Sequence, residues 1–65
     1  MRTDIGFQIE LDRVRDVLRH IDGVTPPIIS AVARMPLVRV YSCLSELDRR
    51  QLAFRELNAD KWWNT

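Results

Sequence analysis

The chain has few of the residue types on which many functional sites depend. It contains one cysteine (Cys43), one histidine (His20) and two glycines among its 65 residues. A lone cysteine forms no internal disulfide, and one cysteine with one histidine falls short of the about four ligands of a structural zinc site. The sequence also lacks a phosphate-cradling glycine loop and a nucleophile elbow. We therefore expect a protein that is not an enzyme and that binds no cofactor or metal.

Long hydrophobic runs are also missing, since no apolar stretch approaches the ~20 residues of a membrane span. The segment Met1–Asp4 lacks the apolar stretch and the small-residue cleavage site of a signal peptide. These absences predict a cytoplasmic protein that does not contact a membrane. The hydrophobic content of 46% suits a folded chain, and 65 residues suffice for a single domain over 1–65 with a marginal core.

Charge of one sign does not dominate the sequence. Ten basic and nine acidic side chains give a net charge of +1, and Lys61 is the only lysine. Domains that bind nucleic acid usually have a clear excess of basic residues. Arginine binds phosphates, guanine edges and carboxylates equally well, so this composition leaves both nucleic-acid binding and protein binding open.

Hydrophobic spacing predicts a first helix between Ile9 and Ile21. Leu11, Val14, Leu18 and Ile21 recur at intervals of three and four residues, as they do on one face of a helix. The helix should end at Asp22–Gly23, because glycine readily adopts the left-handed conformation of a C-terminal cap.

A second, shorter helix is expected from Pro26 to Arg34. Thr25 can cap its first turn, where the missing N–H groups of two prolines do little harm. Met35–Pro36 should end it, since the residue before a proline is disfavoured in the α region.

A third helix is predicted from Leu37 to about Arg50, with Val40, Leu44 and Leu47 on its apolar stripe. The segment 51–55 then alternates apolar and polar residues like a half-buried strand, 58–60 has turn composition, and 61–64 reads as a returning strand. Neighbouring side chains of a strand point to opposite sides, so one of Trp62 and Trp63 should close the core.

Two stretches, Val24–Ile29 and Val40–Leu52, resemble the winged helix-turn-helix superfamily. The second has a valine–tyrosine pair, leucines three residues apart, a charged end and an apolar residue that follows. Trp62–Trp63 is similar to the aromatic residue that closes the second wing strand in many members. The resemblance implies an α+β fold: a three-helix helix-turn-helix core with a C-terminal two-stranded β wing.

This sequence departs from the family pattern at two places. Many members have a small residue and then glycine between the second and third helices, where this chain has 34–36, with the sequence Arg-Met-Pro. Many begin the recognition helix with Ser, Thr, Gln or Arg, whereas this helix begins with Leu37–Val38. The size of the chain resembles that of small phage or bacterial regulators.

The resemblance implies a DNA-binding, transcriptional regulator-like protein with its third helix in the major groove and its wing on the backbone of double-stranded DNA. Burial of the stripe at Val40, Leu44 and Leu47 should turn the opposite side of the third helix outward. The candidate DNA-binding residues are Arg34, Val38, Arg39, Ser42, Ser45, Arg49, Arg55 and Lys61.

The alternative is a protein-interaction module that docks on or inhibits a protein partner. A contiguous patch formed by Val38, Tyr41 and one tryptophan would favour this alternative, whereas basic residues gathered on one side would favour DNA. We also expect a homodimer that uses Ile5 and Phe7 or the first helix. The expected core consists of Leu11, Val14, Leu18, Ile29, Val40, Leu44, Leu47 and Leu52.

Overall fold

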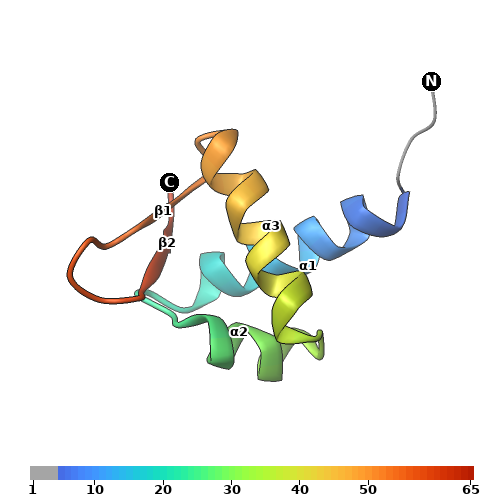
Figure 1. Ribbon diagram of the computed structural model, residues 1–65, viewed down its shortest axis with the longest axis horizontal. Helices are drawn as coiled ribbons and strands as arrows, with labels where there is room; N and C mark the ends of the chain where they lie inside the picture. Colours follow the sequence, from blue (N-terminus) through green and yellow to red (C-terminus); the bar gives the residue numbers. More distant parts are fainter. Residues whose placement is uncertain (1–4) are drawn as a thin grey trace.

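A computed structural model describes residues 5–65 of the chain. Three helices are followed by an antiparallel pair of strands, which gives the expected α+β fold (Figure 1). The elements are α1 (Ile5–His20), α2 (Pro26–Ala33), α3 (Leu37–Arg49), β1 (Ala53–Arg55) and β2 (Trp62–Asn64). Helices α1 and α3 pack against each other, and α2 contacts both of them.

Helix α1 begins four residues earlier than its apolar periodicity predicts, at Ile5, and ends one residue earlier, at His20. Gly23 follows it with a φ of +62°, which confirms the predicted left-handed residue. A Cβ atom at this glycine would lie only 2.9 Å from the indole ring of Trp63. The position therefore requires glycine both for its backbone conformation and for the closeness of the tryptophan.

Helices α2 and α3 are joined by a three-residue turn, and the chain direction changes by 110° between them. This is the geometry of a helix-turn-helix. Arg34 ends α2 in the left-handed region, with a φ of +57°, where many proteins have glycine. Thr25 occupies the N-cap position of α2 as predicted, but its side chain makes no capping hydrogen bond; its backbone carbonyl accepts the first helical bond, from the N–H of Ile29.

Helix α3 passes into the hairpin through Gln51, which also has a positive φ of 61°. The N–H of Leu52 then donates to the carbonyl of Leu47, and β1 starts one residue later. In the hairpin Phe54 pairs with Trp63. The chain between α1 and α2 joins this sheet at one point, where Val24 exchanges two backbone hydrogen bonds with Trp62.

The core lies between the three helices and the inner side of the hairpin. Seven of the eight expected core residues are buried, whereas Leu52 is half-buried and packs against the cluster. Cys43 is fully buried as well. The other buried hydrophobic side chains lie outside the expected core set and come from α1, the connections and the hairpin: Val17, Val24, Met35, Ala53 and Trp62.

Within the described part of the chain, no single helix has the length and apolar character needed to cross a membrane. The bent pair of α2 and α3 meets that test by length and composition only when the two helices are joined.

Candidate nucleic-acid interface

The side of α3 opposite the core is exposed, as predicted. Val38 has 70% of its surface exposed, and Ser42, Ser45 and Arg49 are exposed along the same helix. Burial of Val40, Cys43, Leu44 and Leu47 fixes this orientation. The Ser42 hydroxyl donates to the carbonyl of Val38 at 3.1 Å, so its donor serves the helix itself. Its lone pairs and the Ser45 hydroxyl face outward.

Arg39 lies at the border of that outward surface, where its guanidinium contacts α1. Its Nε donates to the Glu10 carboxylate of α1 at 3.0 Å, and its guanidinium also lies over the ring of Phe7, 5.7 Å from the centroid. Its side chain is less than half exposed. Arg39 thus joins α3 to α1, and its charge is balanced within the protein.

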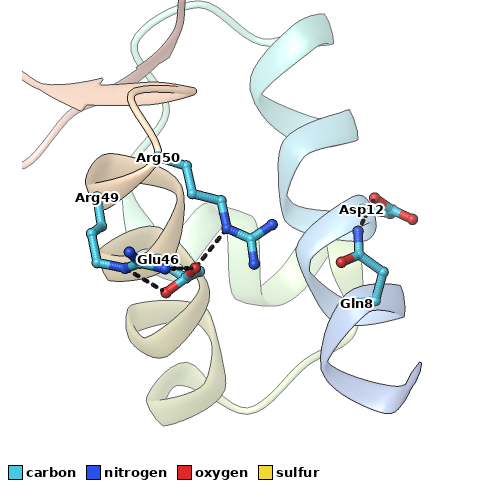
Figure 2. Close-up of polar contacts among 5 residues, drawn as sticks. All are labelled: Gln8, Asp12, Glu46, Arg49 and Arg50. Carbon is cyan, nitrogen blue, oxygen red and sulfur yellow. Dashed lines mark hydrogen bonds and ion pairs between the residues drawn. The ribbon is translucent and has the colours of Figure 1, made fainter. Parts of the chain in front are cut away.

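Arg49 is exposed but forms an ion pair on its own helix. Glu46 accepts from Arg49 Nε at 3.1 Å and from Arg50 Nε at 2.6 Å, so one carboxylate lies between two guanidiniums (Figure 2). The hydrogen bonds from Arg49 and then Arg50 lower the pKa of Glu46 to about 2, and the same contact raises the pKa of Arg49. This cluster of three residues has a net charge of +1. Figure 2 also shows the separate pair of Gln8 and Asp12 on α1.

The other three candidate cations are exposed and lie at the edges of elements. Arg34 ends α2, Arg55 is the last residue of β1, and Lys61 directly precedes β2. Among residues 5–65, no carboxylate lies within ion-pair distance of any of them. Their charges are therefore available to an anion.

A shallow hollow lies between α3 and the hairpin. Its lining residues are Tyr41 from α3 and Arg55, Leu57, Asn58, Ala59 and Asp60 from the hairpin. The Tyr41 hydroxyl donates toward Asp60 at 3.5 Å, so the connection between the strands lies against α3. The hollow combines Arg55 and an amide group with a single carboxylate, which suits a polar ligand better than an apolar one.

The two tryptophans have the opposite orientations that strand alternation predicts. Trp62 is buried in the core, whereas Trp63 stacks on Phe54 with ring centroids 6.5 Å apart and covers Gly23. Phe54 and Trp63 lie on the face of the hairpin opposite to Ala53 and Trp62. Phe54 and Trp63 therefore do not line the hollow beside Tyr41.

The ion pairs of Glu10 and Glu46 with the arginines of α3 were not predicted from the sequence. Glu46 lies three and four residues before Arg49 and Arg50, a spacing that predicts ion pairs on a helix. The pairing of Glu10 with Arg39 had no such signal, because it joins residues 29 positions apart.

Burial, mainly through desolvation, raises the pKa of the Cys43 thiol to about 11, so the thiol is protonated at neutral pH. In the described range 5–65, no three His, Cys, Asp or Glu side chains gather in a way that could hold a metal ion.

No protein-family model, curated protein or solved structure matches this chain. We therefore infer a function from the geometry and charges of the described residues.

Proposed function

We propose that this protein binds double-stranded DNA, with the outward side of α3 in the major groove and the hairpin on the backbone. The observation that carries the proposal is the helix-turn-helix itself: α2 and α3 meet at 110° across three residues. Helices joined in this way present the second helix to a groove. The exposed side of α3 is free of core contacts, and the hairpin follows it directly in the chain (Figure 1).

The proposal divides the candidate residues into two groups. Arg34, Arg55 and Lys61 are exposed without a carboxylate partner in the described chain, so they suit phosphate contacts. Val38 and Ser45 face outward from α3 and suit the base edges, where an apolar side chain meets a thymine methyl and a hydroxyl accepts or donates.

Ser42 and Arg49 complete the proposed contact surface of α3. The Ser42 hydroxyl already donates to its own helix, so it would act as an acceptor toward DNA. Arg49 would contact DNA while sharing its charge with Glu46. Arg39 is assigned a structural role, because Glu10 neutralises it against α1.

The test is a titration with random-sequence duplex DNA at several salt concentrations. Phosphate contacts release counterions, so the logarithm of the affinity should fall as the logarithm of the salt concentration rises. Lys61→Ala should weaken binding to all sequences and reduce the slope by about one unit. Arg13→Ala is the matched control, since it removes one exposed positive charge from α1, away from the proposed surface.

Glu46→Gln gives a result of the opposite sign. It removes the negative charge nearest the outward side of α3 and releases Arg49 and Arg50, so DNA affinity and the salt slope should both increase. A slope near zero for the natural sequence, or equal effects of Lys61→Ala and Arg13→Ala, would contradict the proposal.

A protein-interaction module is the second candidate. It is favoured by the apolar start of α3, where Leu37 and Val38 are exposed, and by the internal pairing of Arg39 and Arg49. In that case Val38→Asp should abolish binding of a protein partner and leave the weak affinity for DNA unchanged.

A further inference from the structure

We propose that the exposed side of α2 is a contact between two copies of this chain. Pro27, Ile28, Ala31 and Val32 form this side, which we call the α2 face. The four residues lie within less than half a turn of the helix circumference at 100° per residue, so they form one continuous strip. Ile28 and Val32, its largest members, are 47% and 55% exposed.

No side chain of the α2 face carries a charge. No charged residue occurs from Gly23 to Ala33, a stretch that includes all of α2. The opposite, inner side of α2 already packs in the core through Pro26 and Ile29. Helix α2 is thus apolar on both sides, and the core of this chain covers only one of them.

Helix α1, the surface expected from the sequence to form the dimer, is less suited to this role. Its Phe7 packs against the core and contacts Arg39, so it is not an unpartnered apolar side chain. Ile5 and Ile9 are exposed, but Ile9 lies in a hollow with arginines and aspartates of the same helix. A partner on α1 would have to desolvate these charges.

The distribution of charge at the two ends of the α2 face favours a second copy as the occupant. Asp22 lies exposed in the turn that leads into α2, and Arg34 lies exposed at the other end of the helix. Both copies of a two-fold dimer use the same patch, and an axis that crosses α2 at right angles to its length would place the two helices antiparallel. Asp22 of each copy would then lie toward Arg34 of the other, and no like charges would repel each other across the strip between them.

The size of the strip determines how tight the contact can be. A standard interface buries about 800 Å² and about 20–30 residues on each partner. The whole described chain exposes 4633 Å², and the α2 face consists of four residues. We therefore expect a weak dimer, with a dissociation constant of roughly micromolar to millimolar magnitude.

The experiment is analytical ultracentrifugation of the full chain from about 10 µM to 1 mM, a range chosen for a weak interface. The weight-average mass should rise from 7.7 kDa toward twice that value as the concentration increases. Val32→Glu should keep the mass at that of the monomer throughout. Ile9→Glu, which places the same charge on an exposed residue of α1, should leave association unchanged. Circular dichroism establishes that both variants are folded.

A second measurement does not depend on a charged substitution. Ala31→Cys places a thiol in the middle of the α2 face, and oxidation should link two copies through it, whereas Gln8→Cys on α1 should not form linked dimers. The buried Cys43 does not compete with either thiol. A constant monomer mass up to 1 mM, or association removed by Ile9→Glu but not by Val32→Glu, would overturn the proposal. The salt titration of the natural sequence tests the proposed function separately, since its slope depends on the cations of the proposed DNA surface and not on the uncharged residues of the α2 face.

Discussion

Three residues within the described range 5–65 adopt a left-handed backbone conformation, and only one of them is a glycine. Gly23, Arg34 and Gln51 have φ angles of 62°, 57° and 61°. Each ends a helix or the turn that follows it, so each lets the chain change direction where the next element begins. A side chain with a Cβ atom costs about 1–2 kcal/mol in this conformation. The backbone therefore carries strain at two of these three positions, Arg34 and Gln51.

Two substitutions at these positions should change stability in opposite directions. Gln51→Gly should raise the free energy of unfolding by roughly 0.5–1 kcal/mol, because the relief of the left-handed conformation exceeds the backbone entropy of glycine. Gly23→Ala should lower it by about 1–3 kcal/mol, since its Cβ atom would also lie 2.9 Å from Trp63. Urea denaturation measures both effects. Gln51→Ala is the control and should give no gain; a gain as large as that of Gln51→Gly would show that strain at this residue is not the cause.

The two sides of helix α3 have different roles. Its inner side supplies four buried side chains to the core, and its outer side carries the proposed contacts. Arg39 lies at the border and connects the helix to Glu10 of α1. The last turns hold Arg49 and Arg50, where positive charge also interacts favourably with the C-terminal end of the helix dipole.

The Glu46 cluster at this end of α3 should respond to acid. Because the native pKa of Glu46 is about 2 and its ordinary value is 4.5, the ion pairs stabilise the folded state above pH 4.5. That contribution is lost as the pH falls from 4.5 to about 2. Glu46→Gln should therefore reduce the dependence of the thermal midpoint on pH in this range. An NMR titration that places the Glu46 carboxyl near 4.5 would contradict the pairing.

The whole molecule depends on one small core. It spans the helices and the inner side of the hairpin, so a single cavity weakens every element. At about 0.05–0.15 kcal/mol per residue, a chain of this length has little stability to lose. The bridge between Val24 and Trp62 matters at this scale, because it attaches the α1–α2 connection to the hairpin.

Leu44→Ala should lower the free energy of unfolding by about 2–5 kcal/mol, which is enough to unfold much of the population at room temperature. Leu44 is fully buried in the middle of α3, so its truncation removes packed atoms from the core. Thermal melting followed by circular dichroism measures the loss. Ser45→Ala, one residue further on the exposed side, is the matched control. A cooperative melt at an unchanged midpoint for Leu44→Ala would refute its position in the core.

The order of the elements and most of the core were predictable, because both depend on local patterns. Spacings of three and four residues placed Leu11, Val14 and Leu18 on one face, and alternation assigned opposite sides to the two tryptophans. The predictions failed where a residue has no periodic neighbour. Val24 and Met35 lie in the connections between helices and are buried by elements that are distant in the sequence. No local pattern predicts that burial.

For the candidate site, the sequence by itself determined which side of α3 faces outward, since burial of Val40, Leu44 and Leu47 leaves only one other side. It also determined that the two helices before the hairpin meet at a tight turn, because Met35–Pro36 interrupts the helical pattern between them. Only the tertiary structure decided which arginines are available to a partner. Arg39 is neutralised by Glu10 from 29 positions away, whereas Arg34, Arg55 and Lys61 are not paired within residues 5–65. An ion pair between helices depends on their packing angle and distance, and neither quantity is encoded in local spacing.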